Sequence, residues 1–354
     1  MNILITNIEL NRRSGTVVYV YELASALNAN GYNVEVYTHV AGETAQELIR
    51  QGINVVTKLN QLKFVPDIVH AHHNLTTIDV LRRFKDIPIV YFLHDRTSFY
   101  DIPIRHSRIL KYIAVDYNCL DRLHIEGRIP EEYTAVIYNW VNVDRFRLRS
   151  EFAEKPSRAL VFSNYAKKNN HYKVIAEACA SYGLQLDVIG EGTGSAVKNP
   201  EDFLAQYDLV FAKAKAAIEA LSTGAAVVLC DFRGLGEMVN PENRSYLRKF
   251  NFGMKTLTRP FDAALMIAEI DKYNALHNQG NAIWIREKSS FTRVLAEITQ
   301  LYEQTIRNYE KGERGIRDNR LHTLWVRCFV KTRISLPVRA ILKLVRITKE
   351  MLQR

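Results

Sequence analysis

The sequence has 354 residues, a formal net charge of +10, and 47% hydrophobic and 24% charged residues, which are values of a globular protein long enough for two domains. The positive charge is concentrated at one end, because residues 311–354 contain twelve Lys and Arg but three Asp and Glu, a balance of +9. The rest of the chain is nearly neutral, which argues against a protein that coats nucleic acid.

The four cysteines lie far apart in the sequence, and no C-x-x-C pair or metal spacing is present among Cys119, Cys179, Cys230 and Cys328. Three of them fall in predicted strands or helices, so this pattern indicates reduced core thiols in a cytosolic protein. The first residues lack the basic segment and the long apolar segment of a secretory signal peptide. No uncharged run is long enough to cross a bilayer.

The N-terminal residues predict a strand, a loop and a helix. Residues 2–7 form the apolar strand, and a loop with Gly15 leads to a helix whose apolar residues follow helical spacing, namely Val20, Leu23, Ala24 and Leu27. A phosphate could meet amide dipoles where the strand gives way to the helix. The loop is not G-x-G-x-x-G, so a dinucleotide site is not indicated, and Gly15 could serve the turn alone.

Further predicted strands run into polar residues that could carry chemistry. The strand at residues 88–93 ends at His94 and Asp95, at the sheet edge where Gly15 is also expected. His94 is therefore either a catalytic residue or a hydrogen-bonded histidine at a strand end. In the strand at residues 67–73, alternation sends His70 and His72 to one face and His73 to the other. No third ligand follows at suitable spacing, so we expect no metal site.

A second α/β half is predicted after a polar linker at about residues 139–156. Its strands are expected at residues 159–163, 186–189, 209–211 and 226–230, and helices dominate from residue 261 onward. Gly190 follows the second of these strands directly. Two α/β halves on a hinge would form a cleft, which is the usual place for a small-molecule site.

The turn after the strand at residues 209–211 carries the strongest ligand signal in the sequence. Small residues alternate there with Lys213 and Lys215, at the carboxyl end of a parallel strand and the start of a helix that ends at Gly224. This arrangement indicates a bound phosphate, and Glu219 could accept hydroxyl groups of a ribose or a sugar one turn later. The same turn could also be a solvated loop without a ligand.

The basic C-terminal segment predicts two amphipathic helices. The first has an apolar stripe formed by Leu321, Leu324, Trp325, Cys328 and Phe329. The second follows Pro337, with one apolar face of Val338, Ile341, Leu342 and Val345 and one basic face of Arg339, Lys343 and Arg346. Such helices suit an anionic membrane surface, so residues 312–354 are expected to contact one. Alternatively, the stripe packs on the body of the protein or on a second subunit.

Four elements within the first three hundred residues resemble a known family. They are the Gly15 loop with the helix ending near Gly31, D-I-V-H-A-H-H with L-H-D (residues 67–73 and 93–95), I-Y-N-W-V-N-V-D-R-F (137–146), and E-A-L-S-T-G-A-A-V-V with G-L-G-E-M-V (219–228 and 234–239). Together they resemble the retaining GT-B glycosyltransferases of the glycosyltransferase family 4-like, group 1 family. That family includes sucrose-synthase-like and bacterial polysaccharide transferases.

The resemblance implies an α/β protein with two Rossmann-like domains facing a cleft. Residues 1–145 would bind the acceptor, residues 146–310 would bind a nucleotide sugar, and residues 311–354 would form a basic amphipathic helical tail. The implied reaction transfers a sugar to a glycan or lipid-linked acceptor with retention of configuration, using no metal or other cofactor. The implied setting is bacterial polysaccharide, lipopolysaccharide or glycolipid synthesis in the cytoplasm, with peripheral contact at the inner face of the membrane and no nucleic-acid partner.

The resemblance also implies roles for individual residues. Glu219 would bind the donor ribose, Gly15 would meet the diphosphate and the sugar, and His94 with Asp95 beside it would act at the reacting sugar. Cations must then neutralise the leaving diphosphate, and the candidates near it are Lys167, Lys168, Lys213 and Lys215. Gly190 completes the expected substrate-binding set.

Two departures from the family pattern leave other functions open. Phe211 stands where the family has a second glutamate that contacts the transferred sugar, and Asn164 stands where an arginine is expected. As in the subgroup that this chain most resembles, the pair Ala214-Lys215 stands in place of the G-R pair of the wider family, which keeps a cation at this position. The alternatives are a nucleotide-sugar epimerase and a catalytically degenerate nucleotide-sugar-binding subunit. An NAD oxidoreductase is disfavoured, because no acidic residue closes the second strand.

Overall fold

The computed structural model describes residues 1–11, 14–167, 169–197 and 199–335, and these residues form two compact units. The first unit contains Met1–Ala114, Cys119–Val136 and the described chain from Leu301 onward, whereas the second contains Val115–Asn118 and Ile137–Gln300. These limits differ from the sequence-based division at residues 145 and 310, because the described C-terminal segment packs on the first unit.

The first unit is built on a parallel sheet whose strand order is β3-β2-β1-β4-β5-β6-β7. Its strands are β1 (Asn2–Leu10), β2 (Asn33–Ala41), β3 (Asn54–Val56), β4 (Ile68–His72), β5 (Ile89–Leu93), β6 (Ile109–Ala114) and β7 (Thr134–Val136). Ile3 pairs with Val34 on one side and with Ile68 on the other, so β1 lies in the middle of the sheet. Its buried apolar residues form the centre of the core.

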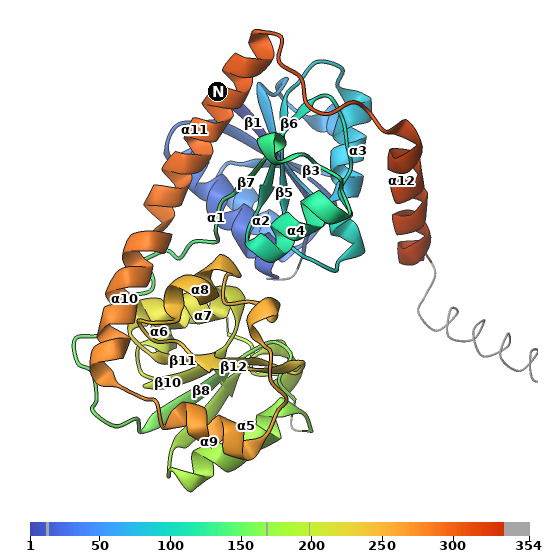
Figure 1. Cartoon of the computed structure of the whole chain (residues 1–354). Coiled ribbons are helices and arrows are strands. Elements are labelled where there is room, and N and C mark those ends of the chain that lie inside the picture. The colour runs from blue at the N-terminus through green and yellow to red at the C-terminus, as the bar shows by residue number, and fades with distance from the viewer. Residues whose placement is uncertain (12–13, 168, 198, 336–354) are drawn as a thin grey trace, which may run out of the picture. The chain divides into compact units, whose positions relative to one another are not determined.

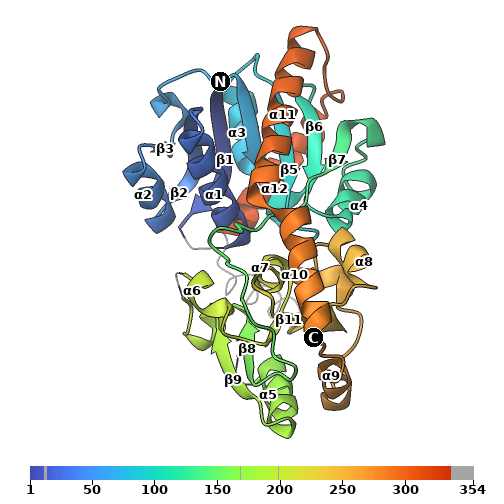
Figure 2. The same ribbon diagram turned by 90° about the vertical axis from the view of Figure 1, so that its left-hand side faces the viewer.

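Helices cover both faces of this sheet (Figures 1 and 2). They are α1 (Gly15–Ala29), α2 (Glu43–Arg50), α3 (Asn74–Arg83), α4 (Tyr117–Ile125), α11 (Phe291–Glu310), whose first part belongs to the second unit, and α12 (Arg320–Ser335), with 3-10 turns η1 (Leu59–Gln61), η2 (Phe99–Asp101) and η3 (Glu131–Tyr133). The stripe predicted for the first helix is confirmed, because Val20, Leu23, Ala24 and Leu27 are fully buried. Helix α12 packs against α3.

The second unit has a five-stranded sheet in the order β12-β11-β10-β8-β9, in which β12 alone is antiparallel to its neighbour. Its strands are β8 (Arg158–Phe162), β9 (Gln185–Ile189), β10 (Leu209–Ala212), β11 (Ala226–Asp231) and β12 (Gly234–Met238). Its helices are α5 (His171–Ser181), α6 (Glu201–Leu204), α7 (Ala214–Thr223), α8 (Arg244–Lys249), α9 (Ala263–Ile270) and α10 (Ala275–Ser289), with η4 (Glu191–Thr193) and η5 (Met254–Thr256).

Two separate apolar layers cover this second sheet. One side packs against α7 and α10 through Val210 and Val227, and the other packs against α5 and α9 through Phe211 and Val228. Phe211 is fully buried. It lies in the second layer, opposite Val210, because successive side chains of a strand point to opposite faces. The residue that departs from the family pattern is therefore a core residue in this chain.

Strand β12 was not predicted, because its sequence lacks the apolar alternation of a strand and contains two glycines. A Cβ atom on Gly236 would lie 2.9 Å from the carbonyl oxygen of Thr256, and one on Gly234 would lie 2.9 Å from that of Arg259. These positions accept glycine because the segment near Thr256 and Arg259 passes so close to the strand.

Each sheet has a point where the order of strands reverses, and ligands of open α/β sheets bind beyond the carboxyl ends of strands at such points. In the first unit this point lies between β1 and β4, and in the second it lies between β8 and β10. The loops that follow these strands contain most of the residues expected to carry chemistry.

Candidate active site

The turn between β10 and α7 presents the start of a helix without a side-chain cap. Lys213 is the N-cap residue and makes no capping hydrogen bond with its side chain. Ala214 has φ of +51°, a left-handed conformation that costs energy in a residue with a Cβ atom. A helix start of this kind attracts anions through its amide groups and its dipole.

A loop from a distant part of the sequence holds this turn in place. The amide of Ala214 donates a hydrogen bond to the carbonyl oxygen of Phe252 at 2.8 Å, and Phe252 is fully buried with φ of +52°. Arg248 donates to the side chain of Asn251 at 2.6 Å and to the carbonyl of Asn139 at 2.7 Å. The segment at residues 251–257, for which the sequence suggested no chemistry, thus supports the β10–α7 turn.

Lys213 is held by a carboxylate that the sequence analysis did not single out. Its Nζ atom lies 3.0 Å from Oδ2 of Asp231, which is fully buried at the end of β11. The ammonium group also lies 5.1 Å from the ring centroid of Tyr165. The pairing neutralises a buried carboxylate and fixes the position of the lysine, so much of its charge is already balanced within the protein.

Lys215 and Glu219 lie one helical turn apart on α7 and face each other. Nζ of Lys215 is 3.8 Å from Oε1 of Glu219, which is 8% exposed. Lys215 also lies 5.7 Å from the ring centroid of Trp140, a buried residue of the segment at 137–146. Two segments that are far apart in the sequence thus meet at one cation, and a carboxylate suited to hydroxyl groups lies beside it.

The loops after β8 and β9 contain three further predicted residues. Lys167 is exposed and forms no ion pair with a described residue, whereas Lys168 lies outside the described residues. A Cβ atom on Gly190 would lie 2.0 Å from the carbonyl oxygen of Ser163, so glycine is needed there for the two loops to touch. Asn164 joins the same loops, since its side chain accepts a hydrogen bond from the amide of Glu191 at 3.2 Å. These contacts give Gly190 and Asn164 a structural part at this edge.

In the first unit, Gly15 is the exposed first residue of α1. A Cβ atom added there would meet no described atom within 4 Å. Its φ is not positive, so the turn does not require glycine for its conformation. The side chain of the cap residue Ser14 makes no capping hydrogen bond with a described residue. Open space beside an uncapped helix start is compatible with the close approach of a ligand.

His94 directly follows β5 and sits among aromatic rings. Its ring centroid is 4.7 Å from that of Tyr19 and 4.7 Å from that of His72. Burial, together with the nearby His73, lowers the pKa of His94 to about 3, so the imidazole is neutral at neutral pH. Its Nε2 atom has no hydrogen-bond partner among the described residues. A neutral imidazole with an unused nitrogen can exchange a hydrogen bond with a sugar hydroxyl.

Three further histidines, His70, His72 and His73, form a buried, neutral cluster near His94. His70 is bonded to the hydroxyl of Tyr302 at 2.5 Å and stacks on Phe92, whereas both ring nitrogens of the fully buried His72 lack a partner among the described residues. His73 turns away, and its Nδ1 accepts a hydrogen bond from the amide of Ile8. Among the described residues, no group of three or more His, Cys, Asp or Glu side chains is arranged to bind a metal ion.

Asp95 organises the loop after β5. Its Oδ1 accepts hydrogen bonds from the amides of Thr97 at 2.6 Å and Ser98 at 2.7 Å. Burial raises the pKa of this carboxyl, but these hydrogen bonds outweigh it and hold the pKa below its usual value. One oxygen of the ionised carboxylate is therefore engaged by its own loop, so Asp95 at least holds the loop beside His94 in place.

Asp101 lies behind the same loop and was not found from the sequence. It is almost fully buried and accepts backbone hydrogen bonds from His94 and Asp95. Burial, followed by the charge of Asp95, raises the pKa of Asp101 to about 8. A single aspartate within an exposed-looking loop sequence carries no signal of such burial, because only the fold encloses it.

Part of the chain matches a known protein family, and its fold matches solved structures. Residues 13–145 match the model of Glycosyltransferase Family 4. Among solved structures, a glycosyltransferase from Rickettsia africae is similar, with 14% identity, a TM-score of 0.61, and coverage of 87% of this chain and 99% of that one. The chain therefore has the GT-B fold, and part of it matches a glycosyltransferase family.

Two further solved structures share the fold of this chain. HepE from Anabaena, in complex with UDP and glucose, has 15% identity and a TM-score of 0.61 over 86% of this chain and 99% of that chain. Sucrose-phosphate synthase from Thermosynechococcus elongatus has 12% identity and a TM-score of 0.60 over 86% of this chain and 98% of that chain. No curated protein sequence matches the chain.

Proposed function

We propose that this glycosyltransferase moves a sugar from a nucleotide-sugar donor to a glycan or lipid-linked acceptor with retention of configuration and without a metal or other cofactor. One observation carries the proposal: the uncapped start of α7 carries Lys215 and Glu219 side by side, at the strand-order reversal of the second sheet. A solved complex of HepE with UDP-glucose supports a donor that is a nucleoside diphosphate sugar.

In this proposal the second unit binds the donor. The start of α7 and Lys215 stabilise the negative charge of the diphosphate, and Glu219 accepts hydrogen bonds from the ribose hydroxyls. Lys213 supports the turn through Asp231, and Lys167 and Lys168 add positive charge from the loop after β8. Gly190, in the loop after β9, would let the backbone there approach the donor.

The first unit would supply the groups around the reacting sugar and the acceptor. His94 is neutral and Asp95 is bound by loop amides, so neither is a strong base. We infer that the acceptor hydroxyl oxygen bonds to the anomeric carbon while the bond from that carbon to the diphosphate oxygen breaks, and that the hydroxyl proton passes to the diphosphate. His94 would orient a sugar or acceptor hydroxyl, and the open space at Gly15 would admit the diphosphate and sugar.

The proposed pathway is bacterial polysaccharide, lipopolysaccharide or glycolipid synthesis. The proposed location is the cytoplasm, with contact between residues 312–354 and the inner face of the cell membrane, where a lipid-linked acceptor would be reached. None of the described helices combines the length and hydropathy needed to span a bilayer. The apolar stripe of α12 is exposed at Leu321, Leu324 and Trp325, which supports a surface contact.

A nucleotide-sugar-binding subunit without transfer activity is the second candidate. Phe211 lies in the core where the family has a carboxylate, so one route of sugar recognition is missing. Such a subunit would bind the donor but would neither hydrolyse nor transfer its sugar with any acceptor. An epimerase would instead consume the donor with no acceptor present.

The first test is a panel of nucleotide sugars in thermal-shift assays, since a ligand that binds the folded state raises its apparent stability. With the donor identified, Glu219→Gln is expected to weaken its binding by roughly 30-fold, the cost of losing a charged hydrogen-bonding partner. Glu177→Gln is the matched control, because Lys173 and Glu177 form the same i, i+4 pair at 3.8 Å on α5. Unchanged donor affinity in Glu219→Gln would sink the assignment.

A further inference from the structure

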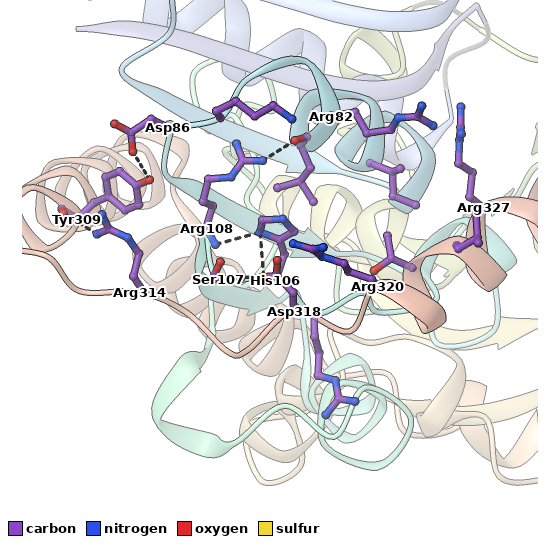
Figure 3. A pocket seen from close by; sticks show the side chains of 16 residues that line it. Arg82, Asp86, His106, Ser107, Arg108, Tyr309, Arg314, Asp318, Arg320 and Arg327 are labelled. Atoms are coloured by element: carbon purple, nitrogen blue, oxygen red, sulfur yellow. Dashed lines mark hydrogen bonds and ion pairs between the residues drawn. The ribbon is translucent and has the colours of Figure 1, made fainter.

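A basic pocket of about 780 Å³ lies in the first unit, away from the residues discussed above. Three segments line it: α3 with the loop that follows it, the loop ahead of β6, and the chain from Tyr309 to Arg327 (Figure 3). Asp86 and Arg108 precede β5 and β6, so the pocket is at the amino ends of these strands. His94 follows the opposite end of β5, and the pocket is therefore distinct from the candidate active site.

The pocket carries a large excess of positive charge. It is lined by Arg82, Lys85, Arg105, Arg108, Arg314, Arg320 and Arg327, against the two carboxylates of Asp86 and Asp318. Asp86 accepts a hydrogen bond from the hydroxyl of Tyr309 at 2.6 Å, and Asp318 accepts one from the amide of Ser107 at 2.8 Å. Among the described residues, no carboxylate forms an ion pair with any of the seven cations. The two carboxylates offset only part of the mutual repulsion of the seven cations.

Arg108 gives a second, independent sign that the pocket suits an anion. Its side chain is nine-tenths or more buried, with the residue 6% exposed, and its Nη2 atom donates to the carbonyl oxygen of Leu81. Its Nη1 atom has no hydrogen-bond partner among the described residues, nor has Nε of Arg327. Buried donors on a charged group are costly to leave unpaired, whereas arginine groups match phosphate oxygens in geometry.

The helix beside the pocket presents an apolar surface. Helix α12 packs against α3. Its Val326 and Val330 are fully buried, whereas Leu321 is 82%, Leu324 57% and Trp325 52% exposed. Leu324 also lines the pocket. A ligand with a phosphate group and an adjoining apolar part would match both surfaces at once.

We propose that this pocket binds the phosphate of an anionic phospholipid headgroup while Leu321, Leu324 and Trp325 enter the apolar layer of the membrane. The inference rests on the membrane contact proposed for residues 312–354, but it assigns that contact to a specific pocket and helix face. It does not depend on the transfer reaction. Vesicle binding and donor binding are therefore measured separately. Failure of the lipid proposal can then be told apart from failure of the enzymatic proposal.

The test is co-sedimentation of the full chain with phosphatidylcholine vesicles that contain or lack phosphatidylglycerol. Wild type is expected to bind the anionic vesicles alone. Arg105→Gln with Arg327→Gln should weaken this binding roughly 25-fold, or about fivefold for each cation removed. The control is Arg50→Gln with Lys58→Gln, which removes the same charge from exposed positions in the same unit and should have a much smaller effect.

A second variant keeps the test valid if the first one folds poorly. Arg82→Gln with Arg320→Gln changes two exposed residues at the rim of the pocket and should weaken binding in the same direction. Equal vesicle binding by the pocket variants and the control would overturn the proposal. Inorganic phosphate or glycerol phosphate could stabilise the wild type but not the pocket variants, while the wild type binds no vesicles. That result would show that the pocket binds a free phosphate and would overturn the lipid proposal. A blue shift of fluorescence on vesicle binding that Trp325→Phe abolishes would support it.

Discussion

The β10–α7 turn and the strand end at His94 handle polar groups in opposite ways. In the turn, Lys213 and Lys215 each face a carboxylate that is almost fully buried, so charges are present and paired. At the strand end, His94 and its histidine neighbours are kept neutral by burial. Paired charges can rearrange around a polyanion, whereas neutral rings suit uncharged hydroxyl groups. The difference supports a diphosphate at the first region and a sugar or acceptor hydroxyl at the second.

The largest expected effect is the response of the first unit to acid. Burial lowers the pKa of His73 to about 4 and that of His94 to about 3, so between these values and the usual 6.5 the unfolded chain binds protons that the folded unit does not. Stability is therefore lost as the pH falls below 6.5, by roughly 1–2 kcal/mol for each such histidine at pH 5. Urea unfolding with hydrogen exchange of β4 and β5 measures it.

Two variants sharpen this prediction. Asp101 contributes with the opposite sign, because its folded pKa of about 8 lies above the usual value and its stabilisation is lost as the pH rises from about 4 to 8. Asp101→Asn should therefore make the acid loss steeper. His72→Leu should make it shallower and leave the protein at least as stable at neutral pH, since neither ring nitrogen has a partner in the described structure. Parallel pH curves for both variants and wild type would contradict this account.

The next effect concerns the paired charges of the turn. Lys213→Met leaves the fully buried Asp231 without its cation and should lower the free energy of unfolding by about 2 kcal/mol, less than for a fully buried pair because Lys213 is partly exposed. Adding Asp231→Leu should recover most of the loss, which denaturant unfolding would detect. If Lys213→Met instead kept full stability and lost donor affinity, Lys213 would be a direct phosphate ligand.

The smallest effect concerns backbone strain at the start of α7. Ala214→Gly relieves the left-handed conformation at φ of +51° but increases the freedom of the unfolded chain, so a net gain of about 0.5 kcal/mol is expected. Ala216→Gly, in the first turn of the same helix, should instead destabilise by up to about 1 kcal/mol. Thermal denaturation compares the two. A loss of stability in Ala214→Gly would show that the turn is not strained.

Sequence spacing found some of the candidate site and missed the rest for a physical reason. Lys215 and Glu219 were both proposed from the sequence as donor-binding residues, and they lie side by side because residues four apart on a helix face each other. Asp231, Trp140 and Phe252 were not linked to this turn, since each comes from a different part of the chain. Gly190 remains a predicted substrate-binding residue, and its close approach to Ser163 adds a structural reason for the glycine that the sequence did not reveal.

The C-terminal segment shows the same division. Its apolar stripe correctly predicted a helix, now α12 (Arg320–Ser335), whereas the helix predicted after Pro337 lies outside the described residues. The alternatives for the stripe were a membrane and the protein body. The helix does pack against α3, but the residues that it buries fully are Val326 and Val330, and most of the stripe stays exposed. Amphipathic spacing identifies a helix, but the shape of α3 decides which residues it buries.

The sequence by itself determined the alternating α/β pattern, the first helix with its buried face, and the Lys-Glu pair of α7, because these depend on neighbours within one strand or one helical turn. The tertiary structure alone decided that Asp231 balances Lys213, that Asp101 is buried behind His94, and that Arg108 and Arg327 share one pocket. Burial and pairing of charge depend on which distant segments the sheet order brings together, and no local pattern of residues encodes that order.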